Sequence, residues 1–324
     1  MRVTFLGTSA GVPTRQRNVA GVALQLPQRG EWWLFDCGEG TQHQILRSGA
    51  LSLGQLTRVF ITHMHGDHLF GLPGLLATGR LAGGARRAHI YGPAGLSEYL
   101  RACWRSTAAD AEFPVEIYEL KSGEVYRDEG FTVSCLPLKH RVPAYGFRVT
   151  EHDRPGRFRA EEAAALGVPF GPLFGQLKRG ETITLPKGQS VDGATLCDPV
   201  EPGRSVAYSG DTIYCEAMLE LARGVDVLIH EATFSERDED LARRSRHSTT
   251  TMAARVAAEA GVRTLLLTHI SPRYAPGTAT TPEDLLHEAR AIFPQTELAH
   301  DFLTFEVPRR LNRQFAPEEQ ASIN

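Results

Sequence analysis

Short apolar runs recur along the whole chain, and most of them end at a glycine or a polar side chain. Short runs rich in branched and aromatic residues predict buried β-strands, and longer mixed stretches predict helices. The alternation of the two predicts an α/β fold. We expect strands over residues 3–7, 22–26, 32–36, 59–62, 89–92, 115–120, 131–136, 205–209, 225–233, 264–268 and 298–306, and helices over 72–81, 95–107, 160–166, 252–260 and from 281 onward.

One strand end carries an unusual density of polar side chains. The run 59–62 leads directly into the segment HMHGDH at positions 63–68. His63 and His65 alternate, so in an extended segment their imidazoles project to the same side and can share one cation. Asp67 and His68 are adjacent, and the glycine before them permits the bend that would bring both to a second ion. The loop therefore predicts a site for two metal ions.

Other strand ends supply the ligands that this loop lacks. His140, Asp211 and His269 each lie just past a predicted strand, as side chains on one rim of a sheet would. A carboxylate can give one oxygen to each of two metals, which makes Asp211 the natural bridge. Nitrogen and carboxylate donors without cysteine fit two Zn²⁺ per subunit, with Mn²⁺ as the alternative. The expected ligand sets are His63, His65, His140 and Asp211 for one ion, and Asp67, His68, Asp211 and His269 for the other, with a bridging water or hydroxide.

Further polar residues are expected beside the metals. Glu231 and His247 lie near the same strand ends, and the pair could protonate a leaving oxygen with the glutamate orienting the histidine. His230 is expected to support the ligands. Arg273, just past His269, is a candidate phosphate contact. In the turn at 36–42, Asp36 or Glu39 is expected to accept a hydrogen bond from a ligand histidine. Ordinary loop polarity is the alternative for each of them.

Composition describes a globular protein rather than a membrane or secreted one. Hydrophobic residues make up 42% of the 324 positions and charged residues 23%, and the formal net charge is −3. That charge gives no global attraction to nucleic acid, so an RNA substrate would need local basic patches. No apolar run approaches a membrane span, and the N-terminus lacks a signal-peptide pattern. Five scattered cysteines indicate reduced thiols and a cytoplasmic location.

The stretch 150–193 differs in character from the rest of the chain. It is rich in glycine and proline with interleaved aromatic and basic residues, among them Gly171, Pro172, Lys178 and Arg179. Such a pattern suits an RNA backbone and stacked bases. A dimerisation flap or a surface lid is the alternative. Arg15 and Arg17, in a polar loop after the first strand, are either phosphate contacts or solvated charges. The residues 309–324 are expected to form a poorly ordered tail.

The His63-x-His65-x-Asp67-His68 spacing resembles the signature of the metallo-β-lactamase superfamily. That resemblance implies an αββα sandwich with a dinuclear site, usually zinc, between its sheets, here as a single domain over 1–308 with 150–193 as an inserted flexible arm. The turn at 36–42, the segments 230–233 and 247–249 and the Gly171-Pro172 arm look like those of the tRNase Z family in its short bacterial form.

This second resemblance implies an endoribonuclease that removes the 3′ trailer from precursor tRNA. The expected products are a tRNA with a 3′-hydroxyl and a trailer with a 5′-phosphate, formed by attack of a metal-bridging hydroxide on the phosphodiester. It also implies a homodimer in which the arm of one subunit grips tRNA for the active site of the other. Asp67 is the general base that the family implies, and orientation of the hydroxide is the alternative role for a metal-bound carboxylate.

Two other functions remain open from the sequence. A small-molecule esterase or thioesterase of the same superfamily would share the metals without needing the arm. A non-catalytic RNA-binding scaffold would need the arm without the metals. The complete ligand set argues against the scaffold, and the arm argues against the esterase.

Overall fold

The computed structural model describes residues 1–81, 88–107 and 115–310. It divides into two compact units. The first contains residues 1–150 and 204–308, and the second contains 151–203 together with 309–324. Most of the predicted tail, residues 311–324, lies outside the described residues.

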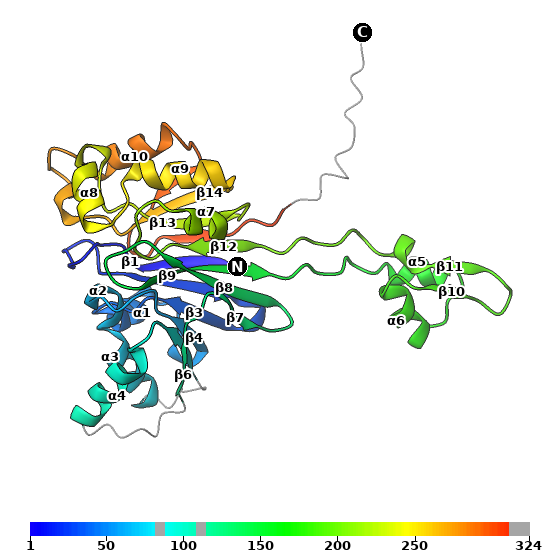
Figure 1. Cartoon of the computed structure of the whole chain (residues 1–324). Helices are drawn as coiled ribbons and strands as arrows, with labels where there is room; N and C mark the ends of the chain where they lie inside the picture. The colour runs from blue at the N-terminus through cyan, green and yellow to red at the C-terminus, as the bar shows by residue number, and fades with distance from the viewer. Residues whose placement is uncertain (82–87, 108–114, 311–324) are drawn as a thin grey trace, which may run out of the picture. The chain divides into compact units, whose positions relative to one another are not determined.

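Two β-sheets form the centre of the first unit (Figure 1). The first sheet contains, in spatial order, β16 (Thr304–Glu306), β1 (Arg2–Gly7), β2 (Gly21–Leu26), β3 (Glu31–Phe35), β4 (Leu56–Phe60), β5 (Ala88–Gly92) and β6 (Val115–Glu119). The second contains β15 (Thr296–Leu298), β14 (Thr264–Thr268), β13 (Val227–Glu231), β12 (Ser205–Tyr208), β9 (Ala144–Glu151), β8 (Phe131–Leu138) and β7 (Gly123–Arg127). β3 to β6 pair in parallel, and so do β12 to β15.

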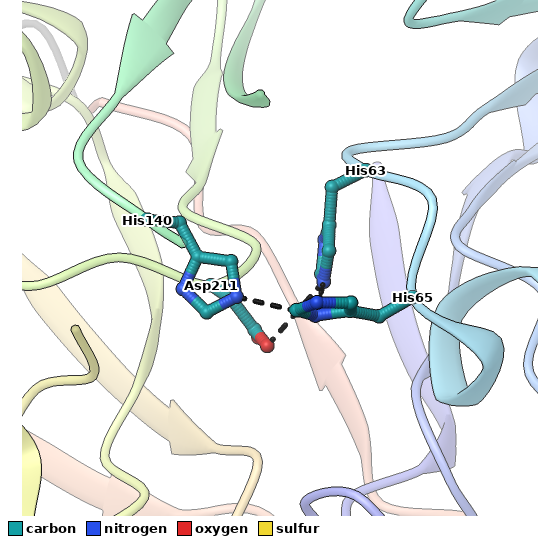
Figure 2. A group of neighbouring side chains, drawn as sticks. All are labelled: His63, His65, His140 and Asp211. Atoms are coloured by element: carbon teal, nitrogen blue, oxygen red, sulfur yellow. Dashed lines mark hydrogen bonds and ion pairs between the residues drawn. The ribbon is translucent and has the colours of Figure 1, made fainter. Parts of the chain in front are cut away.

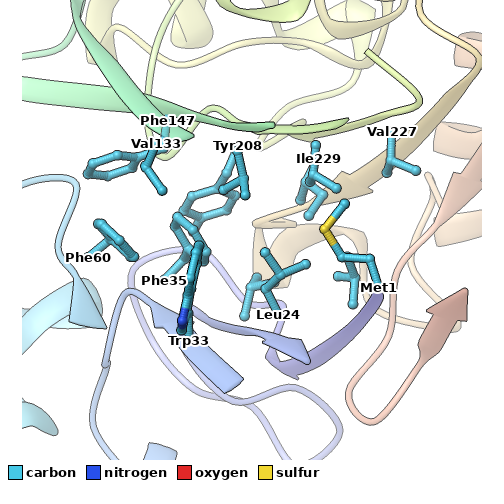
Figure 3. Packing of buried hydrophobic residues seen from close by; sticks show 14 of the residues in the cluster. Met1, Leu24, Trp33, Phe35, Phe60, Val133, Phe147, Tyr208, Val227 and Ile229 are labelled. Carbon is cyan, nitrogen blue, oxygen red and sulfur yellow. The ribbon is translucent and has the colours of Figure 1, made fainter. Parts of the chain in front are cut away.

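The two sheets pack face to face over an aromatic core. Alternation along β3 places Trp33 and Phe35 in this core, while Trp32 and Leu34 face the other side of the sheet. Phe35 stacks on Phe60 with ring centroids 4.9 Å apart. Figure 3 shows these rings meeting side chains from the opposite sheet. Because both faces of the strand are buried, its sequence is continuously apolar.

Helices cover the outer face of each sheet (Figure 1). Apolar residues of helices beside the first sheet join one outer cluster, and those beside the second sheet join another. The expected αββα sandwich is therefore confirmed. The helices are α1 (Thr41–Ser48), α2 (Gly66–Leu69), α3 (Leu72–Leu81) and α4 (Leu96–Ser106) on the first sheet's side, and α7 (Glu216–Ala222), α8 (Glu239–Ser245), α9 (Thr250–Ala260) and α10 (Pro282–Arg290) in the second half.

The second unit is small but has an apolar cluster of its own. It contains α5 (Ala160–Ala165), α6 (Pro172–Lys178), β10 (Thr182–Thr184) and β11 (Ser190–Asp192). Leu177 and Ile183 are buried there, with Phe158 and Phe174 packed against them. Phe170 is 93% exposed and contacts the Phe174 ring at a centroid distance of 5.4 Å. Most of the predicted arm, residues 150–193, falls within this unit, and its role in substrate binding stays a prediction.

The structure departs from the predicted elements at several places. The single last strand expected over 298–306 is wrong, because this stretch divides into β15 and β16 in different sheets. Phe302 between them has φ +66°, a left-handed conformation that no strand can continue through. The apolar pattern also misses β7, β9, β10, β11, α1, α2, α6, α7 and α8. Among the described residues, no helix has the length and apolarity needed to cross a bilayer.

Candidate metal centre

Loops at the ends of four strands bring the predicted ligands together. His63 and His65 follow β4, His140 follows β8, and Asp211 follows β12. His269 comes directly after β14. The carboxyl ends of parallel strands meet at one edge of a sheet, so residues far apart in sequence converge there. His68 and Asp67 reach the same place from α2, which begins at Gly66.

The first predicted ligand group is assembled in the structure (Figure 2). Nε2 of His63 lies 3.0 Å from Nδ1 of His65, and Nε2 of His140 lies 3.2 Å from the same atom. Oδ2 of Asp211 lies 3.6 Å from Nε2 of His63. One ligand atom from each of the four residues lies within 4.8 Å of the others.

The second predicted group shares Asp211 with the first. Oδ1 of Asp211 lies 3.3 Å from Nε2 of both His68 and His269. Oδ2 of Asp67 lies 3.3 Å from Nε2 of His269. Each oxygen of the Asp211 carboxylate thus faces one group of histidines, which is the arrangement expected of a carboxylate that bridges two cations.

Hydrogen bonds on the far side of the rings determine which nitrogen faces the centre. The hydroxyl of Thr62 donates to Asp36, so its oxygen accepts from Nδ1 of His63 at 2.9 Å. Asp36 also accepts from Nδ1 of His68 at 2.7 Å. With Nδ1 protonated, Nε2 of each neutral ring carries a lone pair toward the centre.

The other two histidines with outward Nδ1 atoms follow the same rule. Nδ1 of His140 donates to the backbone carbonyl of Arg246 at 3.0 Å. The hydroxyl of Thr233 donates to Glu231, so its oxygen accepts from Nδ1 of His269 at 2.9 Å. His65 differs, because its Nδ1 points inward. Such partners fix ring orientation and tautomer in metal sites.

These residues fit a pair of divalent cations. Neutral ring nitrogens that all direct lone pairs at one point cannot hydrogen-bond to one another, so a cation is what satisfies them. Oδ1 of Asp211 is buried and has no hydrogen-bond donor among the described residues. Burial and the neighbouring rings hold the pKa of His63 well below the ordinary value, whereas Asp211 and Asp36 raise that of His68 despite its burial. The converging ring nitrogens and the unpartnered Asp211 oxygen therefore suit cations.

Glu231 and His247 form a hydrogen-bonded pair beside both groups. Oε1 of Glu231 accepts from Nδ1 of His247 at 2.8 Å. The His247 ring lies 4.9 Å from that of His140 and 5.5 Å from that of His269, measured between centroids. Burial lowers the pKa of His247, but the carboxylates of Glu231 and Asp211 outweigh it and raise the pKa to about 9. The pair is built to hold a proton on the imidazole at neutral pH.

The carboxylate of Glu231 is fully buried and its acceptor positions are occupied. Backbone amides of Thr212 and Ser248 donate to it at 2.9 and 3.1 Å, and the Thr233 hydroxyl donates at 2.6 Å. Burial raises the pKa of this group, yet the charge and hydrogen bond of His247 bring it below the ordinary value. Glu231 therefore orients His247 and stays ionised.

Close backbone contacts hold the loops of the centre in place. Gly11 donates its N–H to Oδ2 of Asp67 at 2.9 Å, which ties the first loop of the chain to α2. Gly210 has φ +56°, and a Cβ there would lie 2.6 Å from the Thr62 side chain. The turn before Asp211 therefore approaches the His63 loop at a distance that only glycine allows.

Left-handed backbone conformations gather at this centre. Among the described residues, four other than glycine have positive φ, and three of them are Asp36, Arg246 and His269. Such conformations cost of order 1–3 kcal/mol and persist only where the surroundings enforce them. Here they turn a ligand, His269, and two partners of ligands toward the metal groups.

The predicted substrate-binding residues divide into exposed and buried ones. Arg15 is exposed and makes no hydrogen bond or ion pair with any described residue. Arg17 instead donates to the Thr8 hydroxyl and the Ala299 carbonyl at 2.7 and 2.6 Å, so its guanidinium braces its own loop. Arg273 is half exposed, 3.8 Å from Asp238. Gly171, Pro172, Lys178 and Arg179 all lie in the second unit, at the start and end of α6.

One expectation about supporting residues is confirmed and two need correction. Of the two candidates Asp36 and Glu39, Asp36 accepts a hydrogen bond from His68. His230 lies within β13 with its Nδ1 on the carbonyl of Glu231 and reaches no ligand, because alternation turns it to the other face of the sheet. His247 follows helix α8 and not a strand. No sequence pattern predicts the roles of Thr62, Thr233 and Arg246, since their contacts arise only in the folded chain.

Known proteins with similar sequences indicate the family of this chain. A profile for the β-lactamase superfamily domain matches residues 31–159 and 186–270. Ribonuclease Z of Microcystis aeruginosa is 60% identical over 314 residues, which make up 97% of this chain and 98% of that protein. Ribonuclease Z of Acaryochloris marina is 59% identical over 310 residues, or 96% and 98% of the two chains.

The fold of a solved structure indicates the same family. The crystal structure of human tRNase Z, short form, has a TM-score of 0.67 and 30% sequence identity, and the match covers 95% of this chain and 100% of the other. With this fold and this identity to full-length relatives, the chain belongs to the ribonuclease Z family of the β-lactamase superfamily.

Proposed function

We propose that this protein is a hydrolase that cuts the 3′ trailer from precursor tRNA as a metal-dependent endoribonuclease. The observation that carries the proposal is the pair of ligand groups that share Asp211, with the Glu231–His247 pair directly beside them. Family membership supports the substrate, because the relatives are named for ribonuclease Z and tRNase Z. The expected products are a tRNA 3′-hydroxyl and a trailer 5′-phosphate.

The residues of the two groups would hold two Zn²⁺ ions, with Mn²⁺ as the alternative. When bound, such ions stabilise charge on the oxygens of the phosphodiester and make water a better nucleophile at neutral pH. His63, His65 and His140 would hold one ion and His68 and His269 the other. Asp211 would contact both, and Asp67 would complete the second set.

Asp67 has a further role in this proposal. Its Oδ2 accepts from Gly11 while lying beside Nε2 of His269, so the carboxylate is fixed in orientation. Burial disfavours its ionised form, but His269 and His68 bring its pKa well below the ordinary value. A carboxylate so acidic is a weak base, and we infer that Asp67 chiefly orients the attacking water.

His247 is the proton donor of the reaction. Its Nδ1–H is held by Glu231, so the other nitrogen, Nε2, is the one that gives a proton. As hydroxide attacks phosphorus and the bond from phosphorus to the tRNA 3′-oxygen breaks, this proton goes to the 3′-oxygen. The oxygen leaves as a hydroxyl, and the hydroxide oxygen remains on the trailer as part of its 5′-phosphate.

Binding of the tRNA would use basic and aromatic side chains outside the two ligand groups. Arg15 is free to contact a phosphate, and Arg273 can do so by exchanging its contact with Asp238. In the second unit, Lys178 and Arg179 close α6, and the exposed ring of Phe170 precedes the Gly171-Pro172 turn. Cations and exposed rings together suit a nucleic-acid backbone and its bases.

The proposal also covers the oligomeric state and the cellular location of the protein. We infer a homodimer, as the resemblance implies. We infer a cytoplasmic location from Cys37, Cys103 and the three other free cysteines, which suit a reducing compartment. Sedimentation of the purified chain tests the dimer.

Mapping the cleavage of a 3′-extended precursor tRNA tests the function. The protein is incubated with the RNA and Zn²⁺ or Mn²⁺, and both product ends are identified. We expect one cut at the 3′ end of the mature tRNA, with a 3′-hydroxyl on the tRNA and a 5′-phosphate on the trailer. Hydrolysis of small esters without any cleavage of the RNA would replace this proposal with an esterase function.

A further inference from the structure

Arg246 occupies an unusual place for an arginine. It ends helix α8 in the left-handed conformation, with φ +58° and ψ +45°. Glycine is the residue that usually takes this position, because its lack of a Cβ removes the steric penalty. A non-glycine residue there is disfavoured, so the arginine side chain is expected to contribute something that glycine cannot.

Arg246 makes two hydrogen bonds with His140, one in each direction. The backbone carbonyl of Arg246 accepts from Nδ1 of His140 at 3.0 Å. The guanidinium Nη1 donates back to the carbonyl of His140 at 2.9 Å. The first bond fixes the tautomer and orientation of the ring, and the second fixes the backbone that carries it. No other described residue donates to the His140 carbonyl.

The same residue precedes His247. The left-handed turn at Arg246 is closed by the N–H of His247, which donates to the carbonyl of Ala242 at 2.9 Å. The rings of His247 and His140 then meet at a centroid distance of 4.9 Å. One turn of backbone therefore sets both the ring that would hold a cation and the ring that would give the proton.

We propose that Arg246 is a positioning residue that holds the ligand His140 and the proton donor His247 in one fixed relation. This inference rests on the proposed two-ion nuclease function. The hydrogen bond from His140 to the backbone carbonyl at position 246 would survive any substitution that keeps the left-handed turn. The hydrogen bond from the guanidinium needs the arginine side chain, so a substitution can remove that bond alone.

Arg246→Gly separates positioning from folding. Glycine suits φ +58° better than arginine does, so the metal-free variant should unfold at the same temperature as the wild type or higher. The bond from the guanidinium to His140 is lost, while the backbone carbonyl remains. Arg246→Lys is the conservative variant, because its ammonium can still donate to the His140 carbonyl. Arg244→Ala removes an exposed arginine of α8 and serves as the matched control.

Three measurements are made on the full-length chain loaded with Zn²⁺. They are the rate of metal loss to a chelator, thermal unfolding of the metal-free form, and kcat and KM on precursor tRNA. For Arg246→Gly we expect metal loss about 10-fold faster, in the range seen when the partner of a ligand is removed. We also expect a lower kcat with KM within about two-fold, partial recovery in Arg246→Lys, and no change in Arg244→Ala.

The results distinguish this inference from the function on which it rests. Metal loss and kcat at wild-type values in Arg246→Gly would overturn the positioning role. Equal metal loss in Arg246→Gly and Arg244→Ala would overturn it as well. Faster metal loss in Arg246→Gly, with no RNA cleavage even by the wild type, would support the positioning of His140 and refute the nuclease function.

Discussion

Oδ2 of Asp36 accepts a hydrogen bond from Nδ1 of His68 across 2.7 Å, in the fully buried space beneath the metal groups. The same carboxylate accepts from the backbone and hydroxyl of Thr62, which in turn orients His63. The Tyr208 hydroxyl also donates to it, at 2.9 Å. One buried carboxylate thus fixes a ligand from each group, and the centre depends on residues that never touch a cation.

Asp36→Asn tests this dependence. Asparagine tolerates φ +57° as aspartate does, but its amide cannot accept from every donor around it. We expect metal affinity to fall about 10- to 100-fold. The free energy of unfolding of the metal-free chain should fall by about 1–3 kcal/mol. Calorimetric metal titration and denaturant unfolding measure the two effects. Asp240→Asn on exposed α8 is the control, and unchanged affinity in Asp36→Asn would refute the argument.

His247→Ala should affect substrates according to their leaving groups. An alkoxide such as the tRNA 3′-oxygen needs a proton as it leaves, whereas a nitrophenolate does not. We expect single-turnover cleavage of precursor tRNA to fall by about 10²–10⁴-fold, the usual contribution of a general acid. Hydrolysis of bis(4-nitrophenyl) phosphate should change far less. Equal losses on both substrates would show that His247 supports the centre in some other way.

Glu231→Gln should move the pH dependence of cleavage. In the wild type the pKa of His247 is raised to about 9, so the imidazolium is present below that pH and the rate falls as pH rises through it. Without the Glu231 carboxylate the pKa moves down toward the ordinary value of 6.5. The alkaline limb of the single-turnover rate should therefore shift to lower pH, with a larger loss at pH 8 than at pH 6. An alkaline limb at the same pH in both proteins would show that Glu231 does not raise the pKa of His247.

Removal of the arm should separate tRNA binding from chemistry. Arg154 and Glu201 exchange both backbone hydrogen bonds at 2.9 Å, so a short Gly/Ser turn can replace residues 155–200 between them. We expect the KM for precursor tRNA to rise by at least about 10-fold, equivalent to about 1.4 kcal/mol of binding. Hydrolysis of bis(4-nitrophenyl) phosphate should stay the same, which also shows that the first unit has folded. Unchanged cleavage of precursor tRNA would refute the role of the arm.

Much of the fold follows from the sequence because its strands are buried on both faces. Continuous apolar runs such as 32–35 and 265–267 have few alternatives to a central strand. The pattern fails where burial is partial, as in β7, or where the chain changes sheets, as around Phe302. Left-handed conformations at Phe302 and Arg246 carry no signal in residue type, because folding forces them on residues that rarely adopt them.

The ligands are easier to predict than their partners. His63, His65 and Asp67 carry a spacing with a chemical reason, and His140 and Asp211 lie where strands end. The partners of the rings have no such spacing. Arg246 meets His140 across 106 positions of sequence, and Arg17 reaches the carbonyl of Ala299 across 282 positions. Such pairings depend on tertiary packing, which cannot be predicted from a single sequence.

The central claim is that Asp211 joins two cations in one hydrolytic centre. The most direct test is a titration of the chelator-treated chain with Zn²⁺, in which bound metal per chain and cleavage of a 3′-extended tRNA are measured in the same samples. We predict that metal binding saturates at two ions per chain and that cleavage rises with it. Asp211→Ala should bind less metal and cut no RNA. Full cleavage with one ion per chain or none, or by Asp211→Ala, would contradict the claim.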